Sequence, residues 1–191
     1  FTSLNMGYHV GDDAEKVTLN RRHLGEVIKQ KADQWITAEQ VHGAKVQRVT
    51  TADAGKGALD LQSSIKSCDG LFTTDTNLLL TACFADCVPL FFYAKTMPVV
   101  GIAHAGWRGT VGEIARKMVE SWRQTFHLKP SDIYTTIGPS IGSCCYEVDD
   151  QVIDHIHKLS YIEVADVAEP TETHHFRLNL QKLNQFILEE A

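Results

Sequence analysis

Apolar positions along the chain fall into two patterns, and the first consists of short runs rich in β-branched and aromatic residues. These runs predict strands at 45–49, 70–74, 78–84, 88–94, 99–103 and 133–138. The runs at 78–84 and 99–103 are apolar on both faces, which is typical of central strands in a sheet that is covered on both sides.

The second pattern places apolar residues at helical spacing, and it predicts helices over 110–126, 149–159 and 179–190. Thr110 and Glu113 have the three-residue separation of a capping box, so the first helix is expected to begin there. Because strands and helices interleave, the chain is predicted to have an α/β fold with a mixed sheet flanked by helices.

The organisation of the chain indicates one domain over residues 1–191. Its 191 residues are enough for one substantial core, and no repeat, low-complexity tract or Pro/Gly-rich linker divides them. The chain begins with Phe1 and not with methionine, so we expect that it lacks an N-terminal segment.

The net charge and the cysteine content indicate which classes of partner and which cellular compartment to expect. The net charge of −6 provides no footprint for nucleic acid or an anionic membrane surface. The longest apolar run, CVPLFFYA, is too short to span a bilayer. Five cysteines without the spacing of a disulfide framework favour a reducing, cytoplasmic compartment. Nothing in the sequence indicates the oligomeric state.

Side chains with metal-binding or nucleophilic chemistry lie at the ends of predicted strands. Asp86 and Cys87 follow one strand, His104 ends another, and His42 lies in a polar turn before a third. Loops beyond strand ends commonly carry ligands in α/β proteins. Two imidazoles and a thiolate suit zinc with a fourth position open, and they also suit copper. The alternative is a buried structural cysteine and two solvated histidines.

The stretch GIAHAGWRGT, at 101–110, combines His104 and Arg108 with three glycines. It lies where a strand ends and a helix is predicted to begin, and exposed N–H groups at such a junction favour an anion. The guanidinium of Arg108 can bind a phosphate or carboxylate through two hydrogen bonds. A surface salt bridge or a solvated position is the alternative for this arginine.

Five segments in order, QVHG, CDGLFT, ADCVPL, HAGWRGT and GPSIGSCCYEV, resemble the YfiH/YlmD family. The cysteine of ADC precedes the histidine of HAGWRG by seventeen residues, and this pairing is specific. The resemblance implies a fold similar to the YfiH and cytotoxic-necrotizing-factor-like cysteine hydrolases. It also implies that His42, Cys87 and His104 form the metal or catalytic trio.

The function implied by the resemblance is phosphorolysis of adenosine, inosine and methylthioadenosine, with adenosine deamination as a companion activity. The partners would then be purine nucleosides and phosphate, and the cofactor zinc, with copper as the alternative. Asp86 and Glu147 are candidates for proton transfer, and Arg108 for contact with phosphate. Without a metal, Cys87 could act as a thiolate nucleophile with imidazole partners.

Three other functions stay open. Copper-dependent phenol oxidation requires several coppers, whereas one His/Cys/His set supplies one site. Editing of cell-wall precursors is also suggested by the family, and a nucleoside- or metal-binding sensor is the non-enzymatic alternative. Family segments with arginines near both termini do not appear between Phe1 and Ala191, so we expect a site built from this chain alone to be incomplete.

Overall fold

The computed structural model describes residues 4–191, which form ten strands and six α-helices. The strands are β1 Trp35–Thr37, β2 Val46–Arg48, β3 Gly70–Thr73, β4 Leu79–Thr81, β5 Val88–Ala94, β6 Val100–Ala105, β7 Ile133–Ile137, β8 Glu147–Asp149, β9 Ala168–Pro170 and β10 His175–Leu178. The helices are α1 Ala14–Val27, α2 Trp107–Val111, α3 Ile114–Phe126, α4 Asp150–Ile156, α5 Val164–Val167 and α6 Leu180–Glu190.

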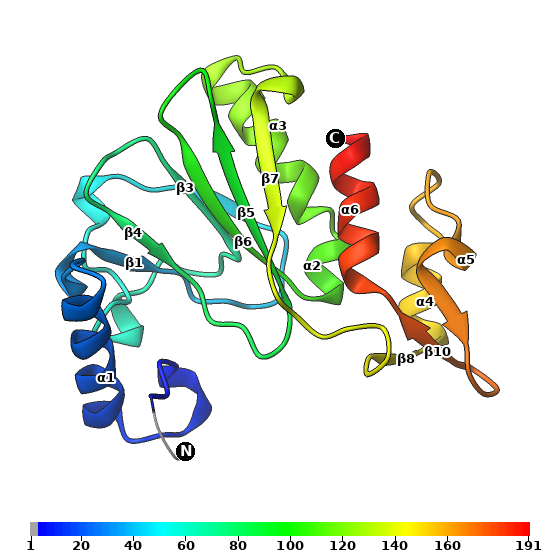
Figure 1. Ribbon diagram of the computed structural model, residues 1–191, viewed down its shortest axis with the longest axis horizontal. Coiled ribbons are helices and arrows are strands. Elements are labelled where there is room, and N and C mark those ends of the chain that lie inside the picture. The colour runs from blue at the N-terminus through cyan, green and yellow to red at the C-terminus, as the bar shows by residue number, and fades with distance from the viewer. Residues whose placement is uncertain (1–3) are drawn as a thin grey trace.

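A five-stranded mixed sheet organises the molecule, with the strand order β2-β3-β6-β5-β7. Only β2 and β3 are parallel, and the other neighbours are antiparallel. Helices α3 and α6 lie along one face of this sheet (Figure 1). Trp122, Met118 and Ile114 of α3 are fully buried there and form the centre of the larger core. The predicted α/β fold with a mixed sheet is confirmed.

Smaller sheets lie on either side of the central one (Figure 1). On one side β1 and β4 pair in parallel, close to α1. On the other side β8, β10 and β9 form an antiparallel sheet with α4 and α5 beside it. A second apolar cluster, which includes Ile36, Leu71 and Ile102, lies between the β1–β4 pair and the central sheet. Among residues 4–191, none of the helices has both the length and the apolar character that crossing a bilayer requires.

The structure corrects the expectation that the run at 78–84 is a central strand. Only Leu79–Thr81 is extended in a sheet, and it pairs with β1 alone. The alternate residues Leu78, Leu80, Ala82 and Phe84 pack against the second cluster, and positions 82–85 leave the sheet to line a cavity. The other two-faced run is placed as expected, because β6 is the middle strand of the central sheet.

The expected helix over 110–126 is divided in two, and the predicted capping box is wrong. Thr110 lies inside α2, where its buried hydroxyl accepts a hydrogen bond from Nδ2 of Asn184 at 2.9 Å. Glu113 has a left-handed backbone with φ of 59° and does not cap α3 through its side chain. The break occurs at Gly112, where a Cβ would lie 2.9 Å from the carbonyl oxygen of Arg108.

Candidate functional site

Three elements bring the predicted trio to one point. His42 lies in the turn between β1 and β2, Cys87 immediately precedes β5, and His104 lies near the end of β6. Strands β5 and β6 are antiparallel with Val88 opposite Ala105, so Cys87 is held beside the end of β6 that carries His104. The sulfur and one nitrogen from each imidazole lie within 4.8 Å of one another. The two imidazole rings meet edge to face, with centroids 4.8 Å apart.

Asp69, which no sequence motif assigned to the site, connects two members of the trio. Its buried carboxylate accepts three consecutive backbone N–H groups, from Val41 at 3.2 Å, His42 at 3.0 Å and Gly43 at 2.8 Å. It also accepts a hydrogen bond from Nδ1 of His104 at 2.9 Å. Because Nδ1 is engaged, Nε2 of His104 is left for the cluster, as in carboxylate–histidine–metal arrangements.

The sequence does contain a signal that could have found Asp69. The aspartate lies between Cys68 and Gly70 at the start of an apolar strand, where its neighbours are buried. A carboxylate buried at such a position needs hydrogen-bond donors, and here they come from the 41–43 turn. The partners could not be named from the sequence, because they are 26 to 35 residues away along the chain.

Burial and hydrogen bonding move the pKa values of the site in opposite directions. Burial by itself lowers the pKa of His104, but hydrogen bonds with Asp69 and Cys87 outweigh it and raise this pKa to about 9. Burial also raises the pKa of Asp69, while the bonds from His104, Gly43 and Val41 bring it below its usual value. The pKa of His42 is lowered, first by desolvation and then by the charge of His104. In the metal-free protein, Asp69 and His104 therefore form an ion pair beside a neutral His42.

The donor set fits one metal ion. Two imidazoles and a thiolate are the ligands that zinc takes at catalytic sites, and a trigonal His₂Cys set is also found at copper sites. The three donor atoms are close enough to share an ion, and Asp69 orients one of the rings from behind. Binding at His104 would displace its proton, so metal affinity would rise with pH.

The cluster lies in the wall of a cavity of about 870 Å³, which is large enough for a nucleoside. The N-terminal segment from Leu4 to Val10 forms part of the wall, together with residues 37–40 and 82–85 and the side chain of Arg21. Phe84 supplies an aromatic surface, and its ring centroid lies 5.6 Å from that of His104.

Two glycines of the GIAHAGWRGT stretch lie where a larger side chain would collide with neighbouring atoms. A Cβ on Gly106 would lie 3.1 Å from Sγ of Cys87 and 3.2 Å from Cδ2 of His42. A Cβ on Gly109 would lie 2.8 Å from the backbone oxygen of Gly43. The absence of side chains at these positions lets the 42–43 turn approach α2 closely.

The other candidate residues lie outside the lining of this cavity. Asp86 is exposed, and its backbone oxygen accepts a hydrogen bond from Ile141 N–H at 3.0 Å. Arg108 is exposed with its guanidinium 4.5 Å from the centroid of Trp107, although its charge contributes to lowering the pKa of His42. Glu147 is exposed on β8 and accepts a hydrogen bond from Nδ1 of His175 at 2.9 Å. The α2 helix that follows β6 has five residues, so it provides little of the helix dipole expected for an anion.

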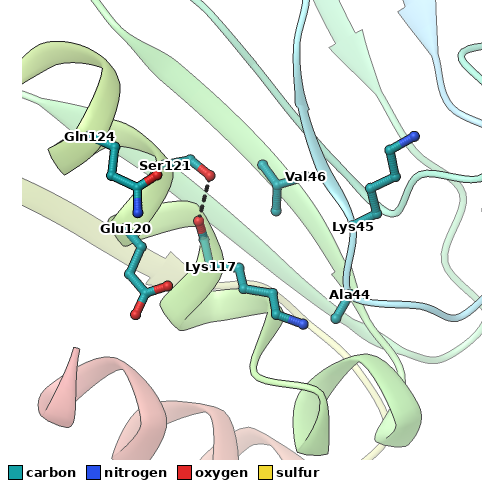
Figure 2. Close-up of a pocket in the computed structure, with 7 residues that line it drawn as sticks. All are labelled: Ala44, Lys45, Val46, Lys117, Glu120, Ser121 and Gln124. Carbon is teal, nitrogen blue, oxygen red and sulfur yellow. Dashed lines mark hydrogen bonds between the residues drawn. The ribbon is translucent and has the colours of Figure 1, made fainter.

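A second hollow, of about 440 Å³, lies between the segment Ala44–Val46 and helix α3 (Figure 2). Its lining residues are Ala44, Lys45, Val46, Lys117, Glu120, Ser121 and Gln124. None of these seven described residues is a histidine or a cysteine. We therefore assign the chemistry to the cavity that holds His42, Cys87 and His104.

Comparison with known proteins agrees with the motifs. A family model described as multi-copper polyphenol oxidoreductase laccase matches residues 1–191. The chain belongs to this family. Relatives named purine nucleoside phosphorylase YlmD are 47% identical over 188 residues in Geobacillus stearothermophilus, covering 98% of this chain and 69% of the relative. The Bacillus subtilis protein of that name is 43% identical over 191 residues, covering 100% and 68%.

Solved structures confirm the fold expected from the YfiH/YlmD resemblance. The crystal structure of YlmD from Geobacillus stearothermophilus matches with a TM-score of 0.95 at 46% identity, covering 100% of this chain and 70% of that one. The match includes β6, which carries His104, and β5, which Cys87 immediately precedes, because it extends over the whole chain.

Proposed function

We propose that this protein is a purine nucleoside phosphorylase that cleaves adenosine, inosine and methylthioadenosine in the cavity holding His42, Cys87 and His104. The single observation that carries the proposal is the convergence of these three side chains within 4.8 Å. The name of its relatives supplies the reaction class. We further propose the reducing cytoplasm as its compartment, because all five cysteines have free thiols.

The reaction transfers the sugar from the purine to phosphate. A phosphate oxygen forms a bond to C1′ of the ribose as the bond from C1′ to the purine nitrogen breaks, and the departing base gains a proton. Catalysis therefore requires a bound phosphate close to C1′, a charged or proton-donating group near the base, and exclusion of water.

Several residues of the cavity support this proposal. Asp69 fixes the ring of His104, and through the N–H groups of the 41–43 turn it also fixes His42. Phe84 offers a face on which a purine can stack. Zinc held by the trio would supply a Lewis acid and a water of lowered pKa, which is the reagent for the companion adenosine deamination.

Two exposed residues near the cluster complete the proposal. Asp86, adjacent to Cys87, is a candidate for carrying protons between the site and solvent. Arg108, whose charge reaches His42, would attract phosphate towards the cavity mouth. We assign Glu147 no step, because its carboxylate is paired with His175 on the exposed face of β8.

Copper-dependent phenol oxidation is the second candidate, and the description of the family favours it. Multi-copper oxidation needs several metal centres, whereas residues 4–191 bring together one cluster of three such donors. We therefore rank phosphorolysis first. Editing of cell-wall precursors and nucleoside sensing are the remaining alternatives, and both predict that no phosphorolysis will be seen in the assay below.

The test is product analysis by chromatography after incubating inosine or adenosine with and without phosphate. We expect hypoxanthine and adenine only when phosphate is present, and inosine from adenosine in either case. Cys87→Ser should abolish both activities, while the exposed Cys144→Ser serves as the matched control. Unchanged nucleosides would indicate a sensor, and oxygen uptake with a phenol would indicate an oxidase.

A further inference from the structure

Arg21 of α1 is a buried cation in the wall of the same cavity. The residue is 4% exposed, and its guanidinium lies 4.7 Å from the centroid of the Tyr8 ring. Nε donates to the backbone oxygen of Met6 at 2.7 Å, and Nη1 donates to those of Gly57 and Ala58, both at 2.8 Å. Neutral carbonyl groups thus hold two of its three nitrogens in a fixed orientation.

The third nitrogen, Nη2, takes no part in these bonds to backbone carbonyls. Besides Tyr8, the side chain that interacts with the guanidinium within residues 4–191 is the neutral thiol of Cys83. Nη2 is also not among the sealed polar atoms without partners, which belong to Gln30, Trp122 and Asn184. Because Arg21 lines the cavity, the two N–H groups of Nη2 are available to a ligand there.

The charge of Arg21 has no counter-ion in the described part of the chain. None of the ion pairs among residues 4–191 includes it. Burial lowers its pKa, with the nearby Cys83 and Tyr8 acting in the opposite direction, and an arginine remains charged in a protein at neutral pH. A buried, unpaired cation is costly, and an anionic ligand would offset that cost.

Arg21 and the trio are joined by one short segment of the cavity wall. Cys83, next to Arg21, is held by Gln40, which donates to its backbone oxygen and accepts from its N–H, both at 2.8 Å. Cys87 follows four residues later. The cavity therefore offers a cation on one part of its wall and the His/Cys/His cluster on another.

We propose that Nη2 of Arg21 binds a phosphate group inside the cavity, which makes Arg21 a substrate-binding residue. That phosphate is the co-substrate rests on the proposed function. That the site binds an anion does not, because it follows from the surroundings of Arg21. Inorganic phosphate and the phosphate of a nucleoside monophosphate share this chemistry. Arg21 suits the role better than Arg108, because a buried charge is screened far less than an exposed one.

The test compares Arg21→Gln with Arg22→Gln, which removes the same charge from the next, exposed position of α1. Thermal unfolding is followed with and without inorganic phosphate, and separately with adenosine monophosphate, in the absence of other substrates. We expect phosphate to raise the Tm of the wild type and of Arg22→Gln but not of Arg21→Gln. In turnover, Arg21→Gln should raise the KM for phosphate roughly tenfold to a hundredfold, with the KM for inosine nearly unchanged.

If Arg21→Gln does not fold, Arg21→Lys provides a second variant for the same test. Its ammonium group can take the three backbone carbonyls that Arg21 binds, which leaves no donor for the ligand, so phosphate should not raise its Tm. Stabilisation of Arg21→Lys equal to that of the wild type would overturn the proposal, as would a wild type that neither anion stabilises. Stabilisation by the nucleotide alone would support the anion site and identify the ligand as a substrate phosphate. Arg21-dependent stabilisation without any phosphorolysis would leave this inference standing and refute the proposed function.

Discussion

Replacing Asp69 with asparagine should change both the stability of the protein and how that stability depends on pH. The carboxylate accepts four hydrogen bonds, one of them from His104, and it is 3% exposed as a residue. Asparagine keeps one acceptor oxygen and turns an NH₂ group towards donors. Because hydrogen bonds to a charged group contribute about 1.5–3 kcal/mol each, we expect a loss of about 2–4 kcal/mol at pH 6.

The pH dependence follows from the pKa of His104, which folding raises from 6.5 to about 9. The charged form is thus favoured in the folded state, and its stabilisation is fully present below pH 6.5 and lost as the pH rises through 9. At about 1.4 kcal/mol per pH unit, this difference corresponds to roughly 3 kcal/mol. In Asp69→Asn the largest contribution that raises this pKa is removed, so most of that dependence should disappear.

The assay is urea denaturation of chelated, reduced protein at intervals from pH 6 to pH 9.5. The stability of the wild type should approach that of Asp69→Asn as the pH rises, while the exposed Asp33→Asn should follow the wild type throughout. Wild-type and Asp69→Asn curves that run parallel over this range would refute the account of the Asp69–His104 pair.

Three further predictions concern the cluster and its surroundings. Gly106→Ala should weaken metal binding and activity at least about tenfold, because its Cβ would push against Cys87 and His42. Atomic absorption would measure the metal content and a turnover assay the activity, and wild-type values of both would contradict the prediction. Gly109→Ala should lower the free energy of unfolding by about 1–3 kcal/mol in urea, because its Cβ meets the backbone oxygen of Gly43; an unchanged midpoint would show that the turn can move away. In the wild type, a chelator should abolish the activity and added zinc should restore it, whereas zinc should restore no activity to Cys87→Ser. Full activity of the metal-free wild type would instead favour a mechanism in which the thiolate of Cys87 is the nucleophile.

Two members of the trio could be found from the sequence because Cys87 and His104 adjoin strongly apolar runs, whereas His42 lies in a polar turn and was joined to them by the resemblance of QVHG to the family. β5 and β6 are recognisable from such runs, and their ends identify Cys87 and His104 as candidates. The pairing of these strands then brings the two side chains together. That part of the site depends on local pattern and on simple sheet geometry.

Asp69 and Arg21 could not be assigned in the same way, because their roles depend on distant backbone groups. Asp69 binds N–H groups in the 41–43 turn, and Arg21 binds the carbonyls of Gly57 and Ala58, 36 and 37 residues away. The polar α1 helix and the short strands β8 to β10 also lack the apolar periodicity that predicts an element. Tertiary contacts therefore determine these parts of the fold.

Phosphorus NMR of inosine, phosphate and enzyme in one tube tests the central assignment most directly. The wild type should convert inorganic phosphate into ribose 1-phosphate as hypoxanthine appears, and Cys87→Ser should leave the phosphate signal unchanged. A wild-type sample in which inosine disappears without any new sugar phosphate, or a Cys87→Ser sample as active as the wild type, would contradict the account.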